Sequence, residues 1–165
     1  MIEVRADYTN FIKRTKHTKS DYFIFLDVEV KGHAQHTGYT NNTRVCAGIS
    51  ACCLGIVRLI DETMFHVEYR SGYFHIWLER KLNRELAKSL DKESVYALNT
   101  LVCQLFEIYN NYPNAFKCFE LNDKGDIENE RRTKQTTNDG ERKPFRQRRK
   151  MGLSSLMEKI DFEEN

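Results

Sequence analysis

The long apolar run from Arg44 to Ile60 constrains the fold of this chain most strongly. Its seventeen residues, RVCAGISACCLGIVRLI, are almost all apolar, and many of them are small. A buried strand is only about four to eight residues long, so the run is too long for one. Short side chains let a helix approach a sheet or a second helix closely. The run therefore predicts a central buried helix over 44–60, with Thr43 as its N-cap and Cys46 in its first turn.

Alternating and helically spaced apolar residues predict the other elements. The polar stretch 10–21 predicts a hairpin connection, and Ser71-Gly72 predicts the tight turn of a second hairpin. Apolar residues recur with helical spacing over 91–109, before Pro113. The predicted strands comprise residues 2–8, residues 22–30, both arms of the hairpin within 64–80, and residues 115–121. The order strand, strand, helix, strand, strand, helix, strand predicts an α+β fold with a mainly antiparallel sheet and two helices.

Charge divides the chain into two parts. Between positions 131 and 150, nine Lys or Arg residues accompany two acidic residues, which gives a net charge of +7. Because the whole chain has a net charge of +2, the rest carries −5. After Asn122 the sequence is charged and poor in apolar side chains, which predicts disorder over 122–150. We expect a folded domain over 1–121 and a charged, largely disordered tail over 122–165, in which GLSSLMEKIDF can form a short helix on a partner.

Composition also limits the compartment and the cofactors that we expect. No stretch approaches the roughly 20 apolar residues of a membrane span, and the N-terminus lacks the pattern of a signal peptide. The chain has five cysteines, and this odd number argues against a disulfide framework. The absence of a C-x-x-C pair argues against a zinc site. The sequence therefore predicts a cytoplasmic protein with no membrane contact, metal or cofactor.

His33 and Cys46 carry the residue types of a cysteine hydrolase at the two ends of one loop. Near the start of a helix, N–H groups and the helix dipole favour an ionised thiol, and the same groups can stabilise an oxyanion. His33, at the end of a predicted strand, is a base that can reach the thiol. The loop contains Gly38 and Asn41-Asn42, which tolerate unusual backbone angles, so it can act as a lid. A buried structural cysteine and a strand-end histidine bound to backbone fit the same spacing.

Three short segments resemble the ribosomal-processing cysteine protease (Prp) family. They are GHA at 32–34, VCAGIS at 45–50 and the junction LFEIYNNYPNAFKCFE at 105–120. The resemblance covers residues 1–121 in the order of the elements. It implies a small α+β protein, usually homodimeric, that removes an N-terminal extension from a ribosomal protein precursor. Phage relatives of this family imply capsid or scaffold proteins as substrates.

Carried over by position, the family's catalytic histidine falls on His33 and its nucleophile on Cys46. Gly32 and Ala34 complete the first motif, and the small polar Ser50 lies one helical turn beyond the cysteine. Gly38 and Thr43 belong to the connector between the two motifs. This connector departs from the family pattern, because it is one residue longer and has Thr43 where the family usually has an aspartate three residues before the cysteine.

Two functions follow from these features. The first is a cysteine endopeptidase with a Cys46–His33 pair that processes a terminal extension of a ribosomal or phage capsid or scaffold protein. The alternative is a catalytically silent binding module that assists assembly of a ribosome or virion. In either case the tail residues can contact RNA or the ribosome through phosphates, or remain a solvated charge run. The tail residues in question are Arg142, Lys143, Arg146, Arg148, Arg149 and Lys150.

Overall fold

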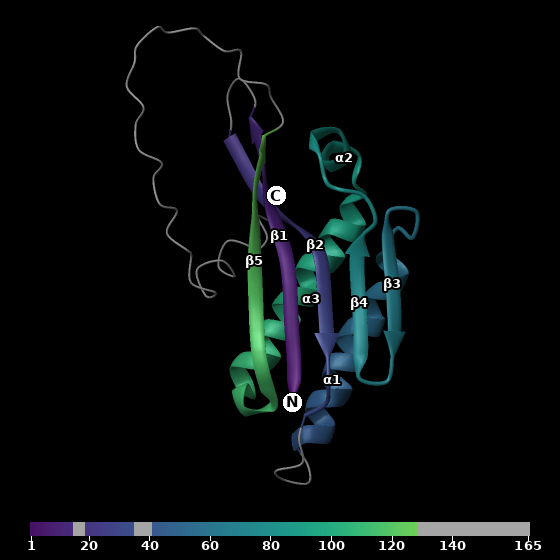
Figure 1. Cartoon of the computed structure of the whole chain (residues 1–165), viewed down its shortest axis with the longest axis vertical. Coiled ribbons are helices and arrows are strands. Elements are labelled where there is room, and N and C mark those ends of the chain that lie inside the picture. Colours follow the sequence, from purple (N-terminus) through teal and green to yellow (C-terminus); the bar gives the residue numbers. More distant parts are fainter. Residues whose placement is uncertain (15–18, 35–40, 129–165) are drawn as a thin grey trace, which may run out of the picture.

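A five-stranded sheet forms the framework of the molecule (Figure 1). The computed structural model describes residues 1–14, 19–34 and 41–128. The strands lie in the order β3-β4-β2-β1-β5, with antiparallel pairing throughout except between β1 and β5, which are parallel. Their bounds are β1 Ile2–Arg14, β2 Lys19–Lys31, β3 Phe65–Arg70, β4 Tyr73–Leu78 and β5 Phe116–Glu128. The predicted α+β fold with a mainly antiparallel sheet is confirmed.

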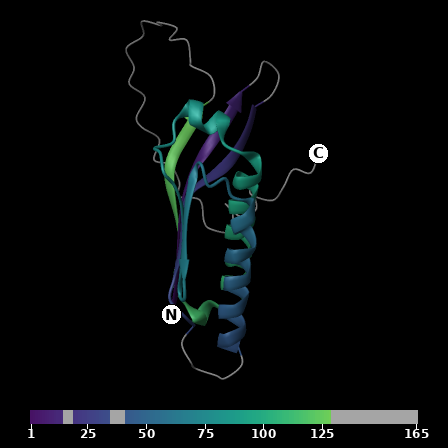
Figure 2. The same cartoon turned by 90° about the vertical axis from the view of Figure 1, so that its right-hand side faces the viewer.

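The two long helices, α1 (Asn41–Ile56) and α3 (Lys92–Asn111), lie together on one face of this sheet (Figure 2). A short helix, α2 (Arg84–Ser89), precedes α3, and 3₁₀ turns over Val57–Leu59 and Pro113–Ala115 follow the long helices. Within the described residues, none of the helices combines the length and apolarity that a membrane crossing requires.

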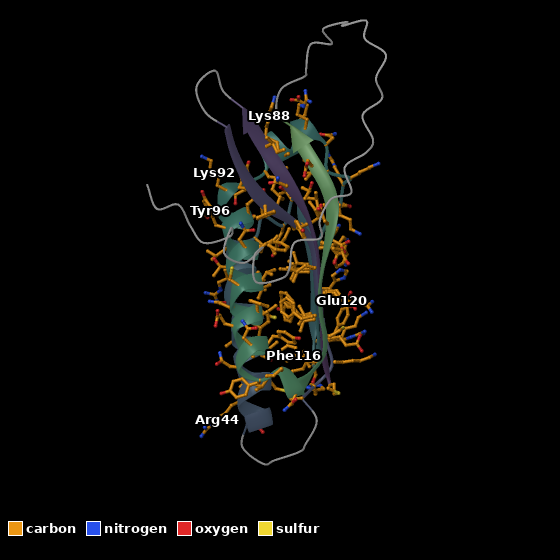
Figure 3. All side chains as sticks on the ribbon, turned by 90° about the vertical axis from the view of Figure 1, so that its left-hand side faces the viewer. Arg44, Lys88, Lys92, Tyr96, Phe116 and Glu120 are labelled. Carbon is orange, nitrogen blue, oxygen red and sulfur yellow. The ribbon has the colours of Figure 1, made fainter. Side chains whose placement is uncertain are left out.

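The hydrophobic core fills the layer between the sheet and the two long helices. Phe25, Val28 and Ile76 from the sheet are fully buried there, as are Leu101 and Leu105 from α3. Figure 3 shows how the strands separate their side chains: Phe116 points toward α3, and Glu120 points away from the helices.

The opposite face of the sheet is polar. Arg5 pairs with Glu120 at 3.4 Å, and Lys117 pairs with Glu3 at 2.8 Å. Trp77 stacks on His75 with ring centroids 4.4 Å apart. Each strand therefore presents apolar residues to the helices and charged or aromatic residues to the outer face, which is the alternation expected of a sheet covered on one side.

Several predicted boundaries are wrong. Residues 10–14 and 19–21 are strand and not connection, because Phe11 and Ile12 are buried and β1 pairs with β2 as far as Arg14. The last strand runs on to Glu128, so residues 122–128, which we expected in the disordered tail, pair with β1. Helix α2 was not among the predicted elements; Asn83 caps it by accepting from the Leu86 N–H at 2.8 Å. Residues 129–165 of the predicted tail lie outside the described residues.

The central helix begins earlier than predicted and ends earlier. It spans Asn41–Ile56, so Thr43 lies in the first turn and is not the N-cap. Cys46 is consequently in the second turn and not in the first. Only the first four N–H groups of a helix lack an intrahelical acceptor, and that of Cys46 comes after them. The prediction that free N–H groups of the first helical turn lie at the thiol is therefore wrong.

Candidate active site

The end of β2 brings His33 and Cys46 into one site. His33 is the second residue after β2, and Cys46 lies on α1. The backbone N–H of Ala34 donates to Cys46 Sγ at a distance of 3.3 Å. Because Ala34 follows His33 directly, this contact fixes the thiol beside the backbone of the histidine.

Both residues line a pocket of about 600 Å³. Its walls come from the end of β2, one side of α1 and the hairpin formed by β3 and β4. Leu54 and Tyr69 stand in its wall with 50% and 59% of their surfaces exposed, although both are large apolar side chains. The thiol therefore faces a groove that is open to solvent and has apolar walls, which suits an extended chain as ligand.

The imidazole of His33 lies against the turn between β3 and β4. A Cβ atom added to Gly72 would lie 3.0 Å from His33 Cδ2 and 3.1 Å from Cε1, and closest of all to Nε2. The backbone N–H of Gly32 donates to the Gly72 carbonyl oxygen at 2.8 Å. The turn thus contacts both the backbone before His33 and the ring itself.

The thiols near the site differ in their surroundings. Cys53 also lines the pocket but is 2% exposed, and burial raises its pKa to about 12. Burial likewise raises the pKa of Cys52. Cys46 is partly buried, lines the pocket and receives the Ala34 N–H.

The structure brings most of the predicted site residues together. Gly32, His33, Thr43, Cys46 and Ser50 all line the pocket. Ala34 is buried beside it and contributes its backbone N–H. Gly38 and the basic tail residues from Arg142 to Lys150 lie outside the described residues. Among the residues that the structure describes, there is no group of three or more His, Cys, Asp or Glu side chains that could hold a metal ion.

Sequence reasoning missed the contribution of the hairpin to the pocket. Tyr69, Arg70, Ser71, Gly72 and Tyr73 line it from β3, β4 and their turn. The sequence predicted the turn at Ser71-Gly72, but nothing in the local pattern connects it with a loop almost forty residues earlier. Pairing of β4 with β2 carries the turn to His33, since Lys31 lies opposite Tyr73.

Comparison with known proteins identifies the family. The family model for cysteine protease Prp matches residues 12–117, which is more than half of the chain. The chain belongs to the cysteine protease Prp family. The resemblance to the Prp family seen in the sequence is therefore confirmed, and the match over residues 12–117 includes both His33 and Cys46. A search of curated protein sequences found no match.

The chain is also similar to several solved structures. The ribosomal processing protease Prp from S. aureus, in complex with a covalently linked product peptide, is 25% identical, with a TM-score of 0.46 over 73% of this chain and 99% of that one. Its complex with a substrate peptide gives 25% identity and a TM-score of 0.44 over the same shares. A Streptococcus mutans protein is 18% identical, with a TM-score of 0.47 over 74% of this chain and 95% of that one.

Proposed function

We propose that this member of the Prp family is a cysteine endopeptidase in which Cys46 is the nucleophile and His33 the base. The observation that carries the proposal is the Ala34 N–H, which donates to Cys46 Sγ at 3.3 Å and so fixes the thiol next to His33 in an open pocket. Membership of a cysteine protease family supports the same assignment.

The reaction then follows the usual course of a cysteine hydrolase. His33 takes the proton of the Cys46 thiol, and the thiolate sulfur forms a bond to the scissile carbonyl carbon. The backbone N–H of Ala34, which donates to Cys46 Sγ in the resting site, then donates to the oxyanion. The C–N bond breaks as His33 returns the proton to the leaving amine, and a thioester remains. Water, deprotonated by His33, attacks the thioester and releases the acid and the thiol.

We infer a protein substrate with a terminal extension. The S. aureus Prp structures contain a substrate or a product peptide, and the apolar groove beside Cys46 has room for an extended segment. A ribosomal protein precursor and a phage capsid or scaffold protein are the two substrate classes. Our proposal also retains the homodimer, the cytoplasmic location, and RNA or ribosome contact through the basic tail, and it moves the end of the folded domain from residue 121 to Glu128, the last residue of β5.

One observation favours the alternative of a silent binding module. Among the described residues that line the pocket there is no Asp or Glu, and Thr43 occupies the position of the family's aspartate. A site that needs a carboxylate to orient the histidine would be inactive here.

Cleavage assays on the full chain decide between the two functions. Peptides that span the N-terminal extension of a large-subunit ribosomal protein, and capsid or scaffold proteins encoded beside the gene, serve as substrates. We expect cleavage that Cys46→Ala abolishes and that His33→Ala slows by about 10²–10⁴-fold. Cys118→Ala, on β5, is the matched control and should cleave at the wild-type rate. Binding of these proteins without cleavage would support the silent module. Undiminished cleavage by Cys46→Ala would reject Cys46 as the nucleophile.

A further inference from the structure

We propose that Gly72, in the turn between β3 and β4, is the residue that positions the imidazole of His33. The inference rests on the proposed Cys46–His33 protease. Gly72 itself takes no part in the chemistry. It acts through His33, by leaving the space that the ring occupies and by holding the backbone that precedes it.

The first contact is between the Gly72 Cα and the ring. The nearest atoms to a Cβ built on Gly72 are Nε2, Cδ2 and Cε1 of His33, which form the far end of the imidazole. The ring therefore points end-on at the turn. Any side chain at position 72 would have to share this space, so a residue with a Cβ must displace either the ring or the turn.

The second contact is made by the Gly72 carbonyl. Its oxygen accepts from the N–H of Gly32, the residue directly before His33, at 2.8 Å. Gly32 has a φ of +89° and its own added Cβ would meet the carbonyl of Met1, so the backbone at this point is confined on both sides. One residue of the turn thus fixes the direction in which the chain leaves β2 and also the position that the ring takes.

These contacts matter because the described pocket lining contains no Asp or Glu that could orient the histidine. In many cysteine and serine hydrolases a third group holds the base by a hydrogen bond. Here the described lining residues contain no carboxylate. Packing against Gly72 supplies the restriction that such a hydrogen bond would supply, and it does so without charge.

Disturbing this arrangement is expected to lower the rate of cleavage strongly. A displacement of about 1 Å in a catalytic group can lower a rate by about 10²-fold. We therefore expect Gly72→Ala to lower kcat for peptide cleavage by about 10²-fold and to change KM by less than about threefold, because the apolar groove that binds substrate is retained.

Two variants separate the ring contact from backbone strain. Gly72 has a φ of +68°, where alanine is strained but asparagine is tolerated better. Gly72→Asn therefore keeps the added Cβ and relieves much of the strain, and we expect it to be as slow as Gly72→Ala. Gly125→Ala is the control, since Gly125 also has a positive φ of +103° but has nothing within 4 Å of an added Cβ. It should cleave at the wild-type rate.

The decisive measurement repeats each Gly72 variant in a His33→Ala background. Alkylation of Cys46 by iodoacetamide is followed at several pH values, since it reports on the thiol even when cleavage is absent. We expect Gly72→Ala to slow alkylation at neutral pH about tenfold or more when His33 is present, and by less than twofold when the imidazole is removed. The drop in melting temperature caused by Gly72→Ala should also be smaller without the imidazole.

The outcomes distinguish the positioning role from the protease itself. Equal losses in both backgrounds would show a purely structural role for Gly72, and full activity of Gly72→Asn would show that the ring does not need this space. Either result overturns the proposal while the Cys46–His33 protease stands. If cleavage does not depend on Cys46 or His33, the proposed function fails, whatever the Gly72 variants do.

Discussion

Replacing Gly32 by alanine is expected to destabilise the fold by about 2–4 kcal/mol. Gly32 has a φ of +89°, and a non-glycine residue in such a backbone conformation costs about 1–3 kcal/mol. The added Cβ would also overlap the carbonyl oxygen of Met1 and lie 3.2 Å from the carbonyl carbon. A backbone carbonyl cannot rotate out of the way as a flexible side chain can. The start of β1 must therefore shift, and with it Ile2, which is 1% exposed. Partial loss of that burial adds about 1 kcal/mol.

Urea unfolding followed by circular dichroism measures this loss directly. With a slope of about 2 kcal/mol per M, the midpoint of Gly32→Ala should lie about 1–2 M below that of the wild type. Gly125→Ala is the reference for strain alone, since its φ is also positive and no atom lies within 4 Å of its added Cβ. If Gly32→Ala is no less stable than Gly125→Ala, the collision with Met1 has no energetic effect, and the reasoning is refuted.

Three further predictions concern the Ser94 hydroxyl, the Asp61 carboxylate and the cysteines. Ser94→Ala should cost about 1–3 kcal/mol in urea unfolding, because its fully buried hydroxyl accepts from the Asp61 N–H at 2.8 Å, and a cost near zero would contradict this. Hydrogen bonds from Thr63 lower the pKa of Asp61 in the folded protein. They therefore stabilise the fold fully at pH values above the ordinary carboxyl pKa, and this stabilisation is lost as the pH falls through the pKa of Asp61 in the folded state. Thr63→Val should therefore raise the pKa of Asp61 in an NMR titration, and an unchanged value would refute the cause. At pH 8 iodoacetamide should label Cys46 and spare Cys53, whose pKa burial raises to about 12, and peptide mass spectrometry showing the reverse order would contradict the assignment.

The site was partly predictable because its two motifs are local. The motif around His33 ends a strand, the motif around Cys46 belongs to the apolar helix, and one short loop joins them, so chain connectivity alone keeps them near each other. The exact depth of Cys46 in the helix was not predictable in this way. Asn41 and Asn42 favour turns and caps in isolation, but here they continue the helix, and this moves Cys46 into its second turn.

Local pattern by itself determined the fold class, the central helix, the second hairpin and the proximity of His33 and Cys46, which line one pocket. Each depends on hydrophobic periodicity or on a short connection, which a sequence records directly. Only the tertiary structure decided that β5 lies parallel to β1 and that the Ser71-Gly72 turn reaches the site. Those contacts join residues far apart in the chain, and they depend on the order of the strands across the sheet. That order is set by how all five strands bury one apolar face under α1 and α3, which no single segment of the sequence specifies.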